Sequence, residues 1–218
     1  MIKAAIFDMD GLLIDSEPLW QEAEKLVFGK VGIQLTPEKM LETMGLRVDE
    51  VVQHWYARQP WENATQEQVT ADLVNNVIVL IKAKGMPMKG VKHAVDFFKS
   101  RNIPMAIASS SLTEIIKAVL DKLDIKDDLK AIHSAEHEPY GKPHPGVYIT
   151  TAAKLGVRPE ECLAFEDSPN GVLSAKAARM KCISIPDPHV ASDPRIQIAD
   201  LVLPSLESLS ESHLSIFK

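Results

Sequence analysis

The chain has 218 residues, of which 45% are apolar and 25% are charged, and its net charge at pH 7 is −6. This composition is ordinary for a folded globular protein, and the acidic balance argues against nucleic acid or an anionic membrane as a partner. Two cysteines argue against a disulfide framework or a thiolate zinc site, and no apolar run reaches the ~20 residues of a membrane span. Acidic residues interrupt any apolar leader near the amino terminus, so we expect a cytoplasmic protein, and we expect it to be a monomer.

The first predicted element is a buried strand at residues 4–7, which is followed by Asp8-Met9-Asp10-Gly11. Gly11 permits a tight turn after the strand. Two carboxylates at a strand end repel each other, so the fold must offset their charge. An Asp-x-Asp pair is weak evidence by itself, because ordinary surface turns contain it too.

No strand is predicted from residue 16 to residue 84. Helices are expected to begin at Ser16-Glu17-Pro18, at Thr36-Pro37-Glu38 and near Val48. A long fourth helix follows the capping-box pattern of Thr65 and Gln68. A structureless loop of about 70 residues would be unusual in a compact protein.

We therefore predict a small helical cap domain at residues 16–85, inserted into an α/β core that comprises residues 1–15 and 86–218. Both ends of the insertion leave the core near the carboxyl end of the first strand. Ligands bind at that edge in open α/β sheets, so the insertion is placed to act as a lid.

After the insertion, short apolar runs alternate with amphipathic helices. Strands are predicted at residues 105–108, 129–132, 162–165, 183–185 and 201–203. Helices are predicted at residues 91–99, 111–123, 146–155 and 170–178. Ser111 and Glu114 are expected to form a capping box at the start of the second of these helices. The strands are almost continuously apolar, as parallel strands covered on both faces are, and the alternation predicts a doubly wound α/β sheet.

Polar residues follow the later strands as well as the first. Ser109, Ser110 and Ser111 open a helix, which suits a phosphate-binding site, although plain helix capping needs only one serine. Lys142 lies in the loop Gly141-Lys142-Pro143-His144-Pro145, where a solvated lysine is the ordinary alternative, and Glu166-Asp167 ends a strand. All these residues are expected at one sheet edge, and together they are what a divalent cation and a phosphoryl group require.

Hydrolysis of a phosphate monoester needs these residue types. A carboxylate nucleophile divides the reaction into two steps through an aspartyl-phosphate. Mg²⁺ held by carboxylates, together with a lysine ammonium, offsets the repulsion between two anions. A second carboxyl two residues away can protonate the leaving oxygen and then activate water. The sequence therefore predicts a magnesium-dependent phosphatase with Asp8 as its nucleophile.

The four motifs, in this order and spacing, resemble those of the haloacid dehalogenase (HAD) superfamily. The resemblance covers the whole chain, because the helical insertion is similar to the cap of the β-phosphoglucomutase-like branch. It implies Asp8 as nucleophile and Asp10 as general acid and base. It also implies Mg²⁺ bound by the Asp8 carboxylate, the Asp10 backbone carbonyl and Asp167, with Glu166 as a ligand or directly beside the ion. The phosphate-binding residues that it implies are Ser109, Lys142 and Ser110.

Residues 7–20, 55–61 and 176–180 are similar to the hexose-phosphate phosphatases associated with 2-deoxyglucose 6-phosphate. The resemblance implies a phosphorylated sugar as substrate, with broad specificity. Gly45 and Arg47 correspond to the specificity loop of the branch, and Arg47 would meet a sugar hydroxyl or a second anion unless it is only a solvated residue at a helix start. Glu17 is expected to face the substrate.

The main alternative is a phosphomutase, which returns the phosphoryl group to the sugar. That class carries a histidine in the first cap helix, where this chain has Trp20, and the difference favours the phosphatase. A dehalogenase proper needs no metal and would leave Asp10 without a task. A catalytically silent binding protein usually lacks a motif carboxylate or the lysine, and this chain has all of them.

Overall fold

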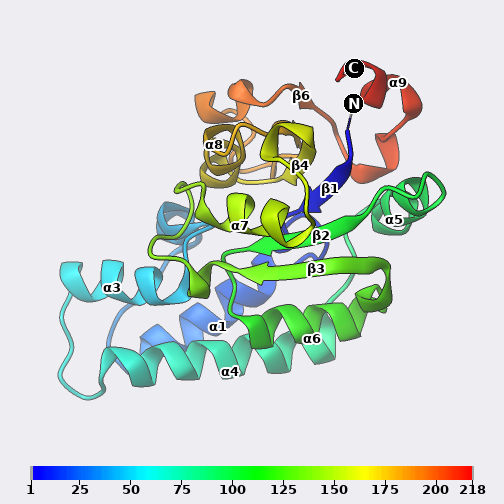
Figure 1. The fold of residues 1–218 in the computed structure, drawn as a ribbon. Helices are drawn as coiled ribbons and strands as arrows, with labels where there is room; N and C mark the ends of the chain where they lie inside the picture. Colours follow the sequence, from blue (N-terminus) through cyan, green and yellow to red (C-terminus); the bar gives the residue numbers. More distant parts are fainter. Residues whose placement is uncertain (1, 218) are drawn as a thin grey trace.

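The computed structural model describes residues 2–217 and contains a six-stranded parallel sheet in the order β3-β2-β1-β4-β5-β6 (Figure 1). The strands are β1 (Ala4–Phe7), β2 (Met105–Ser109), β3 (Leu129–Ser134), β4 (Cys162–Glu166), β5 (Lys181–Ser184) and β6 (Leu201–Val202). Because β1 pairs with β2 on one side and with β4 on the other, the strand order reverses beside β1. Ligands bind at such a switch point, and the predicted doubly wound α/β fold is confirmed.

Both faces of the sheet are buried, as its apolar strands require. In β1, Ala5 and Phe7 belong to one apolar cluster and Ala4 and Ile6 to another. The first cluster includes α5 (Val91–Lys99) and α6 (Thr113–Leu123), and the second includes α7 (Gly146–Lys154) and α8 (Pro169–Ala177). The remaining helices of this part are η2 (Lys126–Asp128), η3 (Ala135–His137), η4 (Pro159–Glu161), η5 (Pro194–Ile198), η6 (Leu206–Ser208) and α9 (Glu211–Ser215).

The start of α6 differs from the prediction. Its first residue is Thr113 and no side chain caps it, so the expected capping box of Ser111 and Glu114 is wrong. The Ser111 hydroxyl instead donates a hydrogen bond to Asp10 Oδ2 over 2.7 Å. A serine hydroxyl that donates its hydrogen bond to a carboxylate of another segment does not cap its own helix here.

Residues 16–85 lie between β1 and α5 and are here called the cap segment. All the regular secondary structure in this segment is helical, as predicted. Its helices are α1 (Glu17–Lys30), α2 (Pro37–Met40), η1 (Leu41–Thr43), α3 (Val48–Arg58) and α4 (Gln66–Lys84). Thr65 and Gln68 form the predicted capping box of α4. In Figure 1, α4 runs alongside α6, against which it packs, and the apolar interior of the cap segment is continuous with that of the sheet.

The two connections between the cap segment and the sheet lie side by side. The Asp15 N–H donates to the Met86 carbonyl over 2.9 Å, and the Met88 N–H donates to the Leu13 carbonyl over 3.0 Å. The chain therefore leaves and re-enters the core at one place, next to the turn that carries Asp10. The division of the chain into two domains at these connections remains a prediction.

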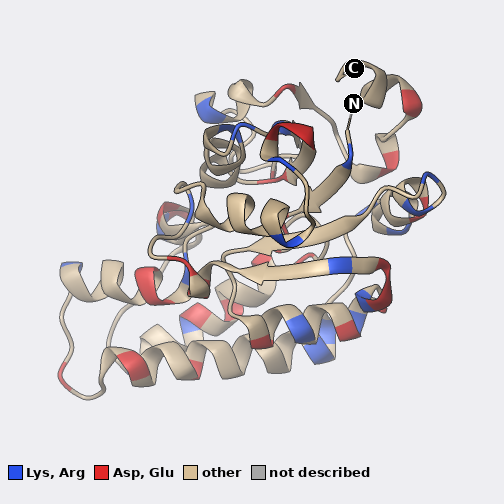
Figure 2. Ribbon diagram, viewed as in Figure 1, with Lys and Arg blue, Asp and Glu red and all other residues tan. Residues whose placement is uncertain are grey.

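Charged residues of both signs are spread over the molecule. In the view of Figure 2, Lys and Arg alternate with Asp and Glu along the helices and do not gather on one face. In this view the described residues show no basic stripe of the kind with which proteins track nucleic acid. Among the described helices, none combines the length and the apolar character that crossing a membrane would demand.

Candidate active site

The carboxyl ends of the central strands bring the four sequence motifs together. Asp8 directly follows β1, and its backbone N–H donates to the Phe165 carbonyl of β4 over 3.0 Å. Ser109 ends β2 and Glu166 ends β4, while Lys142 arrives from the segment that precedes α7. Parallel pairing in register with β1 is what places these ends at one edge of the sheet.

A pocket of about 80 Å³ lies over this edge, between the core and the cap segment. Carboxylates, serine hydroxyls and the lysine line its core side. Apolar side chains from the cap segment, including Met40, Met44, Val48 and Val51, line the other side. A pocket that combines convergent charged groups with apolar side chains is typical of a site for a small molecule that has a charged group.

Lys142 pairs with two carboxylates, one that lines the pocket and one that does not. Its Nζ lies 2.6 Å from Asp8 Oδ1 and 2.6 Å from Glu166 Oε1, and its side chain is almost fully buried. Burial alone would favour the neutral amine, but Asp8 and Glu166 more than offset it and raise the pKa of Lys142. The lysine therefore stays charged and supplies a fixed cation at this point.

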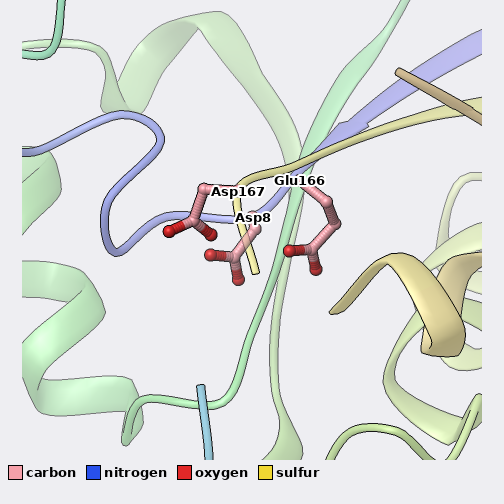
Figure 3. A group of neighbouring side chains, drawn as sticks. All are labelled: Asp8, Glu166 and Asp167. Atoms are coloured by element: carbon pink, nitrogen blue, oxygen red, sulfur yellow. The ribbon is translucent and has the colours of Figure 1, made fainter. Parts of the chain in front are cut away.

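Asp8, Glu166 and Asp167 form a buried acidic cluster, in which one oxygen of each lies within 4.8 Å of the others (Figure 3). In the figure, the Asp8 and Asp167 carboxylates lie side by side, and Glu166 reaches away to the other side of Asp8. Burial raises the pKa of Asp8 to about 7, against the opposing effect of Lys142, and burial with two neighbouring carboxylates raises the pKa of Asp167.

The cluster fits a divalent metal ion. Three carboxylates against one lysine leave a negative excess that a doubly charged cation would balance. Carboxylate oxygens are also the ligands that hard cations such as Mg²⁺ prefer. Gly11 allows the close approach, because its φ of +73° suits glycine and a Cβ there would lie 2.2 Å from Asp167 Oδ2.

Asp10 lies at the same pocket but is not a member of the acidic cluster. Three hydrogen bonds hold its carboxylate. Ser16 Oγ and Trp20 Nε1 donate to Oδ1 over 2.7 and 3.1 Å, and Ser111 Oγ donates to Oδ2 over 2.7 Å. Ser16 and Trp20 lie one helical turn apart at the start of α1, so the cap segment supplies two of the three donors.

Glu166 sits beneath the pocket rather than in its wall. It is fully buried and is not among the residues that line the pocket. Tyr148 Oη donates to Glu166 Oε1 over 2.5 Å, and Ser168 Oγ donates to Oε2 over 3.4 Å. With Lys142 on the same Oε1, the Glu166 carboxylate is surrounded by donors, which is how a buried charge is made tolerable.

The serine motif contacts both the core and the cap segment. Ser109 Oγ accepts a hydrogen bond from the Ser111 N–H over 3.0 Å. Ser110 Oγ donates to the Gly45 carbonyl over 2.9 Å. Gly45 therefore lines the pocket, as expected of a residue near the substrate, and its carbonyl is already engaged with the core.

Arg47, like Glu166, is a predicted site residue that does not line the pocket. Its guanidinium donates to Asp49 and to the carbonyls of Ala135 and Glu138, over 3.2 and 3.0 Å for the carbonyls. These contacts join the start of α3 to the core instead of facing a ligand. Glu17, in contrast, lines the pocket as predicted, and burial raises its pKa.

Several residues of the site have no counterpart in the motifs. Ser16 and Trp20 contact Asp10, and Tyr148 and Ser168 contact Glu166. Ser111, the third donor to Asp10, belongs to the serine motif. The spacing of Ser16 and Trp20 on one helix face was the available sequence signal. Tyr148 gave none, because a tyrosine in an amphipathic helix reads as ordinary core.

Comparison with known proteins shows the family of this chain. A family model described as "haloacid dehalogenase-like hydrolase" matches residues 2–179, and the chain belongs to that family. Over 214 residues it is 45% identical to hexitol phosphatase B of Escherichia coli (strain K12), which covers 98% of this chain and 96% of that protein. The chain is thus an enzyme of the phosphoric monoester hydrolase class, as the motifs predict.

Solved structures show the same fold over nearly the whole length. CbbY from Rhodobacter sphaeroides in complex with phosphate aligns with a TM-score of 0.89 at 23% identity, over 96% of this chain and 97% of that one. β-Phosphoglucomutase from Clostridium difficile aligns with a TM-score of 0.87 at 23% identity, over 100% and 97%. The chain therefore shares its fold with these two structures over nearly its whole length.

Proposed function

We propose that this enzyme is a magnesium-dependent phosphatase of sugar phosphates that works through an aspartyl-phosphate on Asp8. The observation that carries the proposal is the position of Asp8, which is buried in the floor of a small pocket, 2.6 Å from Lys142 and within the acidic cluster. A carboxylate in that place can attack a phosphoryl group whose charge a lysine and a metal ion offset. The similarity to a hexitol phosphatase supports a sugar as the alcohol part of the substrate.

We assign the proton transfers to Asp10. As an Asp8 oxygen bonds to phosphorus, the bond from phosphorus to the ester oxygen breaks, and Asp10 donates a proton to the departing alcohol oxygen. Asp10 then accepts a proton from the water that attacks the aspartyl-phosphate, which releases inorganic phosphate and restores both carboxyl groups. The hydrogen bonds from Ser16, Trp20 and Ser111 support this role by orienting the side chain.

Phosphate binding is assigned to Ser109, Ser110 and Lys142, whose side chains line the core side of the pocket. Asp8, Asp167 and the Asp10 backbone carbonyl would hold Mg²⁺, which when bound offsets negative charge on the phosphoryl oxygens. We assign Glu166 to holding the lysine, because it pairs with Lys142 below the pocket.

The proposed substrates are hexose and hexitol phosphates, of which 2-deoxyglucose 6-phosphate is one. Gly45 and Glu17 line the pocket and are the cap-segment residues that we expect near the sugar. Trp20, which donates to Asp10, stands where a phosphomutase of this branch would carry a histidine, and this supports hydrolysis over phosphoryl return.

The test is phosphate release from 2-deoxyglucose 6-phosphate and sorbitol 6-phosphate, measured with Mg²⁺ and again with a chelator. We expect release with Mg²⁺ only, and a loss of at least about 10³-fold in Asp8→Asn, since that amide is no nucleophile. Asp15→Asn is the matched control, because Asp15 is exposed at the connection to the cap segment. Undiminished turnover by Asp8→Asn would contradict the nucleophile. Conversion of β-glucose 1-phosphate to glucose 6-phosphate in the presence of a bisphosphate primer, without phosphate release, would identify a mutase.

We further propose that the enzyme works as a monomer in the cytoplasm. Cys162 and Cys182 are both buried and not joined to each other, which is compatible with a reducing compartment. Size-exclusion chromatography with light scattering tests the oligomeric state, and a mass of about twice 24.1 kDa would contradict it.

A further inference from the structure

Glu24 is a buried carboxyl group whose position the reaction does not explain. It lies on α1, its residue is only 7% exposed, and it lines the pocket. Its Oε2 atom is buried and has no hydrogen-bond partner among the described residues 2–217. Proteins satisfy nearly all of their buried polar groups, so an unpartnered carboxyl at a pocket points to a partner that binds there.

The burial of the Glu24 carboxyl lowers the stability of the protein when no ligand is bound. Burial, with a smaller contribution from Glu17, raises the pKa of Glu24 to about 8. The group is therefore largely protonated near neutral pH, and it can donate one hydrogen bond and accept another. An apolar residue of the same size would fit this place better, since Met40, Val48 and Val51 line the same side of the pocket.

The distance from the reacting centre to Glu24 is set by one helix. Trp20 and Glu24 are four residues apart on α1, so they lie on the same face, about one 5.4 Å turn from each other. Trp20 Nε1 contacts Asp10, the proposed acid for the leaving oxygen. A substrate whose ester oxygen lies at Asp10, and whose carbon chain runs along α1 for one turn, therefore reaches Glu24 with an atom several bonds from that oxygen.

We propose that Glu24 is a specificity-determining residue that hydrogen-bonds a hydroxyl group at the end of the substrate remote from its phosphate. The inference rests on the proposed function and deepens it. It selects phosphorylated polyols and sugars long enough to span the pocket, and it disfavours short esters and esters with an apolar end. The free-energy gain is the pairing of a polar group that the protein itself leaves unpaired.

The test compares sorbitol 6-phosphate with the shorter glycerol 1-phosphate in Glu24→Met and Glu24→Gln. For Glu24→Met we expect KM for sorbitol 6-phosphate to rise about tenfold, with kcat and both constants for glycerol 1-phosphate within about twofold of wild type. Glu24→Gln keeps a donor and an acceptor and should stay within about threefold throughout. Glu22→Met is the matched control. Glu22 lies on the same helix as Glu24, but it is exposed and pairs with Lys84 of α4.

Thermal unfolding separates this role from a structural one. Glu24→Met should unfold at a higher temperature than wild type, because an unpaired buried carboxyl is removed. A lower unfolding temperature, or an equal loss on both substrates, would overturn the proposal. So would a preference of the wild type for glucosamine 6-phosphate that Glu24→Gln abolishes, since that would show pairing with an ammonium group.

The two proposals can fail separately. If wild-type protein hydrolyses sorbitol 6-phosphate and Glu24→Met does so with the same KM, the role of Glu24 is wrong and the phosphatase stands. If wild-type protein releases phosphate from no sugar phosphate, the proposed function is wrong and the role of Glu24 falls with it.

Discussion

The indole N–H of Trp20 donates a hydrogen bond to Asp10 Oδ1 over 3.1 Å, which joins the first helix of the cap segment to the acidic turn of the core. Trp20→Phe removes this donor and keeps most of the ring. We expect kcat to fall about tenfold with little change in KM, because Asp10 loses a group that orients it in the transition state.

Trp61→Phe is the control for that substitution. Trp61 packs against Phe28 and Tyr56, and its buried Nε1 has no hydrogen-bond partner among the described residues. The same chemical change there should leave kcat unaltered. Equal effects of the two substitutions on steady-state kinetics would show that Trp20 acts through packing rather than through Asp10.

Mg²⁺ should stabilise the folded protein without any substrate. The ion would relieve repulsion among buried carboxylates, and a ligand at 100 times its dissociation constant adds about 2.7 kcal/mol to the free energy of unfolding. We expect the melting temperature to rise and saturate as MgCl₂ is added, at constant ionic strength. Asp167→Asn should remove most of this shift, and Asp15→Asn should keep it. A melting temperature that does not change when Mg²⁺ is added would contradict the metal site.

Arg47 should control how firmly the cap segment closes. Its guanidinium donates to the carbonyls of Ala135 and Glu138 in the core, so Arg47→Ala removes two hydrogen bonds between the cap segment and the core. We expect faster amide hydrogen exchange in α3 and a KM raised several-fold. Arg58→Ala is the control, because Arg58 pairs with Glu42 inside the cap segment. Unchanged exchange in Arg47→Ala would show that these bonds do not hold α3 against the core.

The carboxyl of Glu24 should make stability depend on pH. Its pKa is about 8 in the folded protein against an ordinary value of 4.5. Between these values the folded chain holds a proton that the unfolded chain has released, so the contribution of Glu24 to stability falls as pH rises, by at most about 1.4 kcal/mol per pH unit.

Glu24→Gln removes that proton linkage. In urea unfolding at pH 5, 6.5 and 8, the free energy of unfolding of the variant should rise relative to that of the wild type as the pH increases. Below pH 4.5 the difference between the two free energies of unfolding should vanish. Glu22→Gln should show no such trend, because Glu22 is exposed and pairs with Lys84. A stability difference that is independent of pH would mean that Glu24 titrates normally.

The sheet and its reactive edge were predictable because parallel strands leave a strong local pattern. Three of the apolar runs end in a polar motif, and parallel pairing then places Asp8, Ser109 and Glu166 at one edge. The contacts around them were not predictable in the same way. Ser111 looked like a helix cap because local spacing says nothing about Asp10, its partner 101 residues away.

The contacts of the cap segment were harder to predict from the sequence for the same reason. Arg47 has the charge of a substrate-binding residue, but backbone carbonyls far along the chain engage it. Glu24 looks like a solvated residue of an amphipathic helix, and only the packing of α1 over the core shows that it is buried at the pocket. Tertiary contacts rather than helical periodicity decide both cases.

The paired connections of Asp15 with Met86 and of Leu13 with Met88 have a consequence for how such enzymes diversify. Because the chain exits and returns at one point, a short turn or a different insertion could replace residues 16–85 without altering any strand pairing. The reactive edge can thus be inherited intact while the inserted part is exchanged. Such an exchange removes the donors Ser16 and Trp20 from Asp10 Oδ1, so a new insertion that keeps the same environment for Asp10 must supply donors of its own.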